Sequence, residues 1–319
     1  MRHRRAVPRL SRGRCPNVVL ALLLAGSALL PWTLGLRSRG DLVRRRGTVV
    51  GAEGGLFVGS ARAAAQETVP VRVPHVLDVR PHDPGAFTQG LVLHEGSLYE
   101  STGRDGGEAR LREVNPLTGT IVREIYLPPA EDGSTYWGEG LARVGDRLVQ
   151  LTWRHGVAFD YDLATFAELR RFRYDGEGWG LCHDGERLVM SNGSNKLTFR
   201  DPETFTVLAT VDVTIEGWPR DRLNELECVD GFVYANVFLT DEIVRIDPHT
   251  GAVVERIDAS GLLTPEEELT ADVLNGIAYD PTRRTFLLTG KWWPKLFEVQ
   301  FVPRPRPRDA YIPLALRGR

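Results

Sequence analysis

The feature that most constrains the fold of this chain is a pattern that occurs five times between residues 89 and 302. Each occurrence opens with a three-residue motif and continues as an apolar run, a polar turn and a second apolar run. Such a pattern is typical of two antiparallel strands joined by a tight turn. The five motifs are Gln89-Gly90-Leu91, Glu139-Gly140-Leu141, Trp179-Gly180-Leu181, Asn224-Glu225-Leu226 and Asn275-Gly276-Ile277.

A second predicted hairpin follows the first in four of the repeats. Its turns lie at residues 115–119, 161–165, 201–204 and 247–251, and three of them contain an Asn-Pro or Asp-Pro pair that favours tight turns. Each repeat therefore accounts for four strands, and successive motifs lie 40 to 51 residues apart. Four-stranded units at this spacing predict an all-β fold, a five-bladed β-propeller of four-stranded blades.

The fifth repeat ends before its fourth strand. After the apolar run 296–302 the chain enters a segment rich in proline and arginine, which cannot hold a strand ladder. Residues 73–79, at the other end of the repeat region, are the candidate for the missing strand. We expect this N-terminal strand to complete the last blade and to remove an exposed sheet edge. The predicted propeller domain spans residues 67–303, and residues 304–319 form a tail.

Charge and length exclude some functions and leave others open. The chain has 319 residues, of which 42% are hydrophobic, and its formal net charge is −2. This balance gives no basic footprint for nucleic acid, so we expect no nucleic-acid partner. The repeat region has the length of one domain with a single core.

Residues 1–66 differ in composition from the rest and predict an export signal or a membrane anchor followed by a linker. Six arginines lie within residues 2–14, and residues 16–36 are uncharged and largely apolar, long enough to span a bilayer. Arginines at 44–46 follow this run, so an alternative is a misassigned start codon with a second, weaker signal near residues 43–63. We therefore expect an exported protein, periplasmic or extracellular, with a possible membrane tether through residues 16–36.

The chain has three cysteines, and their spacing is not that of a zinc finger. Cys15 precedes the apolar run and lacks the context of a lipid-attachment site. Cys182 and Cys228 fall on the first strands of neighbouring repeats, where a bridge is compatible with an oxidising compartment. Their positions within the repeat differ by one residue, which points them to opposite faces of regular strands. The sequence therefore favours two buried free thiols over a disulfide.

Aligned positions of the repeats predict a site, because the innermost strands of a propeller converge on one axis. The position two before the aligned apolar residue holds mostly hydrogen-bonding side chains. A second column lies at the end of the second strand, and two further aromatics precede the first two motifs. The first column is Gln89, Glu139, Trp179, Asn224 and Asn275; the second is Gly103, Trp153, Gly193, Phe238 and Lys291; the further aromatics are Phe87 and Trp137.

Both columns are expected at one end of the propeller, where they would line a mouth with aromatic walls and a few polar groups. This arrangement is typical of a small-molecule site. Glu139 lies between two glycines and behind Tyr136 and Trp137, so dry surroundings would raise its pKa toward the range useful for proton transfer. The alternatives are a turn glutamate, ordinary core tryptophans and a polar plug of the channel.

Six ordered motifs within residues 74–302 resemble the glutaminyl-peptide cyclotransferases of the plant and bacterial type. The motifs are Phe87-Thr88-Gln89-Gly90-Leu91, Trp137-Gly138-Glu139-Gly140-Leu141, Leu223-Asn224-Glu225-Leu226-Glu227, Asn236-Val237-Phe238-Leu239-Thr240-Asp241, Leu274-Asn275-Gly276-Ile277-Ala278 and Thr289-Gly290-Lys291-Trp292-Trp293-Pro294-Lys295-Leu296. The resemblance implies a five-bladed propeller and an enzyme that converts the N-terminal glutamine of a peptide or protein to pyroglutamate with release of ammonia. It implies no cofactor and no metal.

Individual roles follow from the same resemblance. Glu139 is similar to the essential acid/base of that family. Its polar binding residues are matched by Gln89, Asn224 and Lys291, and its aromatic wall by Phe87, Trp153 and Trp179. Trp137 stands where the family often has Phe, and Phe238 where it often has Trp, so both departures keep an aromatic surface.

Two other classes of function fit the same residues. A metal-dependent lactonase-like propeller also gathers Glu and Asn oxygens on its axis, which suits calcium, although Lys291 would repel a cation. A non-catalytic envelope propeller would bind peptides or glycans at the same face. Sensitivity to a chelator distinguishes the first class, and binding without ammonia release distinguishes the second.

Overall fold

The computed structural model describes residues 68–103 and 109–305, all of which belong to one compact unit. The predicted export segment, Cys15 and most of the predicted tail lie outside these residues. The described part is all-β, as the repeats predicted, and its one α-helix is α1 (Pro265–Glu268). None of its helices has the length and apolar character needed to cross a membrane.

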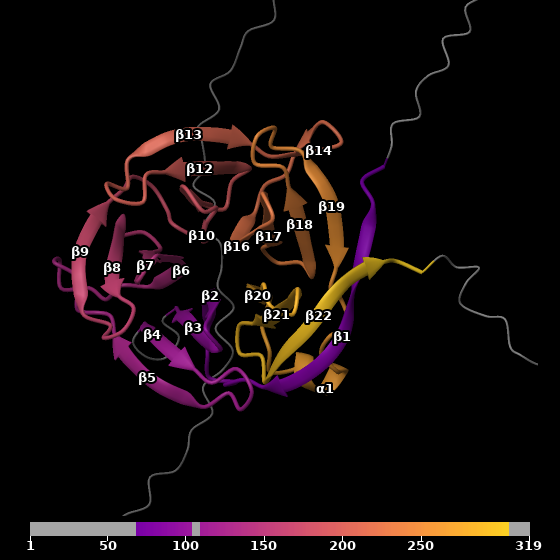
Figure 1. Ribbon diagram of the computed structural model, residues 1–319, viewed down its shortest axis with the longest axis horizontal. Helices are drawn as coiled ribbons and strands as arrows, with labels where there is room; N and C mark the ends of the chain where they lie inside the picture. Colours follow the sequence, from indigo (N-terminus) through magenta and orange to yellow (C-terminus); the bar gives the residue numbers. More distant parts are fainter. Residues whose placement is uncertain (1–67, 104–108, 306–319) are drawn as a thin grey trace, which may run out of the picture. The chain divides into compact units, whose positions relative to one another are not determined.

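Most strands form four-stranded groups that follow one another around a centre (Figure 1). The first group is β2 (Thr88–His94), β3 (Ser97–Thr102), β4 (Arg110–Val114) and β5 (Ile121–Tyr126). The second is β6 (Gly138–Val144), β7 (Arg147–Thr152), β8 (Val157–Asp162) and β9 (Glu168–Arg173). The third is β10 (Leu181–His183), β11 (Leu188–Met190), β12 (Lys196–Arg200) and β13 (Val207–Asp212). A short hairpin, β14 (Thr214–Ile215) and β15 (Trp218–Pro219), follows.

The remaining strands form an eight-stranded sheet of two halves. One half is β16 (Leu223–Val229), β17 (Phe232–Val237), β18 (Glu242–Ile246) and β19 (Val253–Asp258). The other is β20 (Leu274–Asp280), β21 (Thr285–Gly290), β22 (Lys295–Pro303) and β1 (Val71–Pro81). β1 pairs antiparallel with β22, from Arg72 opposite Pro303 to Pro81 opposite Lys295, and parallel with β19. The two ends of the described chain therefore lie side by side in one sheet (Figure 1).

The first strands of the five groups lie innermost, and each contacts the next. β2 contacts β6, β6 contacts β10, β10 contacts β16, β16 contacts β20, and β20 contacts β2. This cycle requires very close backbone approach, which glycine permits. A Cβ on Gly90 would lie 2.5 Å from the backbone nitrogen of Leu141 in the neighbouring group. Four of the five motifs carry glycine at this position, namely Gly90, Gly140, Gly180 and Gly276.

The fifth motif has Glu225 at the glycine position, and its carboxyl group joins three inner strands. It accepts hydrogen bonds from the backbone N–H of Leu91 on β2 at 3.3 Å and of Ile277 on β20 at 2.8 Å. Glu227, also on β16, accepts from the N–H of Tyr279 at 3.0 Å. Burial raises the pKa of both carboxyl groups, that of Glu227 to about 8. The buried Glu225 and the half-buried Glu227 thus accept hydrogen bonds from backbone N–H groups of other inner strands.

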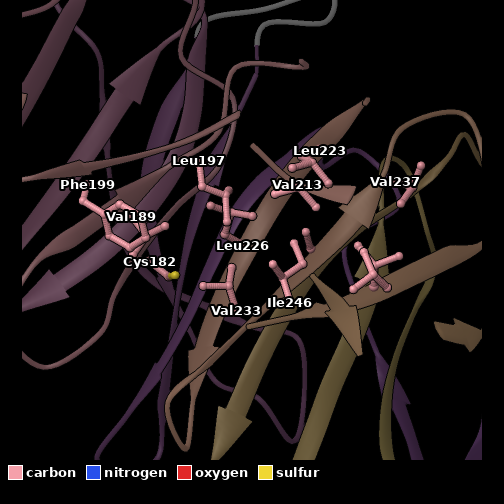
Figure 2. Packing of buried hydrophobic residues seen from close by; sticks show 13 residues of the cluster. Cys182, Val189, Leu197, Phe199, Val213, Leu223, Leu226, Val233, Val237 and Ile246 are labelled. Atoms are coloured by element: carbon pink, nitrogen blue, oxygen red, sulfur yellow. The ribbon is translucent and has the colours of Figure 1, made fainter. Parts of the chain in front are cut away.

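Apolar side chains pack between the faces of neighbouring groups. One cluster joins β10–β12 to β16–β18 and includes Cys182, Val189, Leu226 and Val233, which Figure 2 shows gathered between the two groups. Leu181, next to Cys182, belongs instead to the cluster shared with the second group. Adjacent residues of one inner strand therefore face opposite neighbours.

The prediction of two free thiols was wrong, because Cys182 and Cys228 form a disulfide with their Cα atoms 5.5 Å apart. The one-residue offset does point them to opposite faces of their own sheets. In a ring of sheets, however, one face of each sheet packs against the other face of the next. Cys182 and Cys228 therefore meet between β10 and β16, beside the cluster that contains Leu226.

Removing the disulfide should destabilise the domain. The two cysteines are 46 residues apart, and closing a loop of that length restricts the unfolded chain by about 4 kcal/mol. Urea unfolding of the oxidised protein should therefore show a higher midpoint than that of the reduced protein. The Cys182→Ala/Cys228→Ala variant should match the reduced protein and be insensitive to reductant. Equal midpoints for all three would contradict a stabilising bridge.

Stability should also fall with rising pH because of Glu227. Its folded-state pKa of about 8 lies above the ordinary value of 4.5, so the unfolded state loses its proton first. The stabilisation is fully present below pH 4.5 and is lost as pH rises to about 8. In a series of thermal unfolding curves, Glu227→Gln should flatten this decline. Glu95→Gln, at an exposed carboxylate, is the control and should leave the slope unchanged. An unchanged slope in Glu227→Gln would refute this account.

Candidate active site

Three of the predicted polar residues form a hydrogen-bonded chain across three inner strands. Asn275 on β20 donates to the side-chain oxygen of Gln89 on β2 at 3.2 Å, and Gln89 donates to Glu139 on β6 at 2.9 Å. All three side chains are buried. The repeat alignment therefore predicted correctly that these residues converge.

Irregular backbone directs these side chains out of their sheets. The strand register shifts between Thr88 and Gly90, between Gly138 and Leu141, and between Leu274 and Ile277. A β-bulge of this kind leaves a residue outside the ladder and re-aims its side chain. Gln89, Glu139 and Asn275 each lie within such a shift, which explains how side chains of neighbouring sheets reach one another.

Glu139 and Lys291 form the charged centre of this group. Burial raises the pKa of Glu139 well above its ordinary value; the nearby Lys291 opposes this shift, and Glu177 adds to it. Burial also lowers the pKa of Lys291, against the attraction of Glu139 and Asp272. Each group thus has a pKa displaced toward neutrality, which suits proton transfer.

Aromatic rings lie beside Lys291 and pack against one another. The Lys291 ammonium lies 4.6 Å from the ring centroid of Phe87 and 5.1 Å from that of Phe238, distances typical of cation–π contacts. Trp137 packs against Phe87 and Trp153, with centroids 5.4 and 5.8 Å away, and Trp179 packs against Phe238 at 5.3 Å. We call the polar chain, Lys291 and these five aromatics the inner cluster.

Two glycines of the second predicted column make room for the tryptophans. A Cβ on Gly103 would lie 2.5 Å from the indole nitrogen of Trp137, and one on Gly193 would lie 2.7 Å from the ring of Trp179. Both distances are shorter than side-chain packing allows. Two positions of this column therefore hold glycine to leave space for a tryptophan, and the other three hold residues of the inner cluster.

Asn224 is buried on β16, but its side chain makes no hydrogen bond to the rest of the cluster in the described structure. Within the described part of the chain, its Oδ1 atom has no hydrogen-bond partner, and the same is true of Oδ1 of Asn275. Buried amide oxygens without partners are costly, so both are available to a ligand that donates hydrogen bonds.

Glu177 is a functional candidate that the repeat alignment missed. Its carboxylate accepts from the indole N–H of Trp153 at 2.8 Å and of Trp179 at 2.9 Å, and it binds Arg154. Partial burial would raise its pKa, but these hydrogen bonds outweigh burial and hold it below the ordinary value. No other repeat has an acidic residue at this position, two residues before the first predicted column, so alignment of the repeats gave no signal for Glu177.

A second buried network of hydrogen bonds and ion pairs contacts residues next to the cluster. Glu100 accepts a hydrogen bond from the hydroxyl of Thr88 at 2.6 Å and lies 3.2 Å from His82, whose other ring nitrogen lies 2.8 Å from the carbonyl of Trp293. Arg112 pairs with the same carboxylate. Burial opposes the charge of His82, but attraction to Glu100 prevails and raises the His82 pKa. The network therefore fixes both the residue before Gln89 and the turn that carries Lys291.

Among the described residues, no three His, Cys, Asp or Glu side chains gather in a way that could hold a metal ion.

Comparison with known proteins identifies relatives over most of the chain. The family model described as glutamine cyclotransferase matches residues 53–301. A glutaminyl-peptide cyclotransferase of Arabidopsis thaliana is 40% identical over 238 residues, which cover 73% of this chain and 72% of that protein. The crystal structure of Myxococcus xanthus glutaminyl cyclase is also 40% identical, has a TM-score of 0.66, and matches 74% of this chain and 99% of its own.

Replacing Glu177 should loosen the two tryptophans that it holds. In Glu177→Ala, two indole N–H groups lose a charged acceptor, which should lower the free energy of unfolding by about 1–3 kcal/mol. Tryptophan emission should shift to longer wavelength because water reaches the freed rings. Glu131→Ala, which removes an exposed partner of Arg173, is the control. Emission identical to that of the parent would show that Glu177 does not orient the rings.

Proposed function

The chain belongs to the glutamine cyclotransferase family, and we propose that its inner cluster converts the N-terminal glutamine of a peptide or protein to pyroglutamate. It is a glutaminyl-peptide cyclotransferase, an acyltransferase. The observation that carries the assignment of the site is the buried Glu139 carboxyl group, which accepts a hydrogen bond from Gln89 at 2.9 Å and interacts with Lys291, whose ammonium contacts aromatic rings. A carboxyl group in such surroundings is suited to exchange protons with a bound amine.

The proposed reaction needs one proton to move between two nitrogens. The α-amine of the glutamine attacks its own γ-carboxamide carbon, a new C–N bond closes the five-membered lactam, and the C–N bond to the carboxamide nitrogen breaks. Glu139 takes a proton from the attacking nitrogen and gives one to the departing nitrogen, which leaves as ammonia. Its charge is the same before and after the cycle, so no co-reactant is required.

Binding and orientation are the proposed roles of the other residues. Lys291 would stabilise the negative charge that develops on the carboxamide oxygen. Gln89, Asn224 and Asn275 would hold the amine and carbonyl groups, and the two unpartnered amide oxygens favour a ligand rich in N–H donors. Because the reaction is intramolecular, fixing the cyclic conformer supplies a large part of the acceleration.

The aromatic side chains would favour cyclisation of the carboxamide over its hydrolysis. Phe87, Trp137, Trp153, Trp179 and Phe238 would exclude water, which favours attack by the amine over hydrolysis. Glu177 would hold Trp153 and Trp179 in place from outside the cluster, since it accepts from both indole N–H groups.

We also propose that the domain, residues 67–303, is a five-bladed propeller whose last blade is closed by β1. The pairing of β1 with β22 and the cyclic contacts of the five inner strands support this reading. Export to the periplasm or the extracellular space is proposed from the apolar run at residues 16–36 and from the Cys182–Cys228 bridge, a bond typical of oxidising compartments.

Substitution of Glu139 tests the proposal. Glu139→Gln keeps the shape of the side chain but cannot transfer a proton, so kcat/KM for a glutaminyl dipeptide should fall about 10²- to 10⁴-fold. In the parent, activity should decline as pH falls through the raised pKa of Glu139, above the ordinary value of 4.5, because the ionised form accepts the proton. Ammonia release by the parent and by Glu139→Gln, followed across a pH series, measures both the loss of kcat/KM and the decline of activity at low pH.

The controls separate the competing functions. A chelator should leave ammonia release by the parent unchanged, and Glu131→Gln should behave as the parent does. Full turnover by Glu139→Gln would refute the proton-transfer role. Loss of activity with a chelator would indicate a metal-dependent enzyme, and peptide binding without ammonia release would indicate a binding protein.

A further inference from the structure

Two tight turns beside the inner cluster carry a large side chain where a tight turn favours glycine. In residues 237–240 the N–H of Thr240 donates to the carbonyl of Val237 at 3.1 Å, and in residues 290–293 the N–H of Trp293 donates to the carbonyl of Gly290 at 3.3 Å. The third residue of each turn has positive φ, +64° for Leu239 and +59° for Trp292. Turns of this kind usually place Gly or Asn there.

The two turns are equivalent in the repeat, and the side chains of their second residues contact each other. Each follows the second strand of its group, with Phe238 and Lys291 at the matching second position of the turn. The Lys291 ammonium lies 5.1 Å from the centroid of the Phe238 ring, so both turns contribute a side chain to the charged centre of the cluster. Leu239 and Trp292 therefore follow directly after residues of the proposed site.

Packing explains the conformation of Trp292 but not that of Leu239. Trp292 is half-buried, and its ring centroid lies 5.1 Å from that of Phe87. Leu239 is 59% exposed, so its apolar side chain adds little to the stability of the folded domain and does not offset the strain of its backbone. Strained backbone with an exposed apolar group beside a site is the combination expected where the side chain serves a ligand.

In the second group, the position equivalent to Leu239 and Trp292 holds a charged residue, Arg154. Arg154 follows Trp153, lies over its ring at 3.7 Å and binds Glu177 at 2.9 Å. The surroundings of the cluster are thus charged at Arg154 and Glu177 and apolar at Leu239 and Trp292. A peptide whose glutamine occupies the cluster must place its next residues outside it, against one of these surfaces.

We infer that Leu239 and Trp292 form a subsite for the apolar side chain of the residue that follows the N-terminal glutamine, with Leu239 determining specificity. This inference rests on the proposed function. Leucine or a similar side chain at the second position would cover the exposed Leu239 and pack against the edge of Trp292. Glycine at that position would gain neither contact, so the enzyme discriminates between the two peptides.

Two variants of Leu239 test the subsite, and both suit positive φ. Leu239→Gly and Leu239→Asn remove the apolar side chain at a position where glycine and asparagine are favoured, so both variants should fold. The substrates are glutaminyl-leucine amide and glutaminyl-glycine amide, whose blocked carboxyl ends avoid a charge near Lys291. The ratio of kcat/KM for the leucine over the glycine substrate should fall about 3- to 10-fold, chiefly through KM.

A matched control places glycine at another residue with positive φ, far from the inner cluster. Glu95 has φ +48° in the turn between β2 and β3, at the end of these strands that lies opposite the inner cluster. Glu95→Gly should raise or preserve the melting temperature and leave the substrate ratio as in the parent. A ratio that falls in both Leu239 variants and not in this control supports the subsite.

Other outcomes overturn the inference. An unchanged ratio would show that Leu239 makes no contact with the second residue. An equal loss for both substrates would show that it only shapes the turn that carries Phe238. Ammonia release by the parent in these two cases leaves the proposed function intact, whereas no release from either substrate by the parent would overturn both proposals.

Discussion

Close contact between the backbones of neighbouring inner strands is the constraint on which the rest of the structure depends. Gly90 comes so near to Leu141 that no Cβ fits between them, and the same geometry recurs at Gly140 and Gly180. Only at this separation can Gln89 on one sheet reach Glu139 on the next with a single hydrogen bond. The glycines that close the ring therefore also assemble the proposed site, so an alanine at such a position would disturb fold and chemistry together.

The repeat made a large part of this arrangement predictable. Once the motifs are aligned, equivalent residues must meet on one axis, and Gln89, Glu139, Asn275 and Lys291 could be grouped without any structure. What the alignment could not predict lies between repeats. The disulfide depends on which faces of neighbouring sheets pack together, and the contacts of Glu177 and Trp292 come from side chains that differ between equivalent positions of the repeats. Periodicity specifies what the repeats share, whereas the particular side chains of a site come from where they differ.

Carboxyl groups of the inner strands have two distinct roles at the centre of the domain. Glu225 and Glu227 accept backbone N–H groups of other inner strands, so their raised pKa accompanies a structural function. Glu139 instead accepts from the amide of Gln89 and faces Lys291. A raised pKa alone therefore does not identify a catalytic acid in this protein. The partners of Glu139 support its proposed role, because of these three carboxyl groups it alone, in the described part of the chain, interacts with a lysine and accepts a hydrogen bond from a side-chain amide.

Glu139 and Lys291 are best regarded as one unit. Burial moves the pKa of the acid up and that of the amine down, and their mutual attraction opposes both shifts. The charged and neutral forms of the pair are thereby brought closer in free energy, which lowers the cost of moving a proton at the centre of the cluster. Removing the charge of Glu139 must further lower the pKa of Lys291, since it removes the attraction that holds the ammonium. The effects of substituting the two residues will consequently not add, and a double-mutant cycle rather than either single variant measures what the pair contributes.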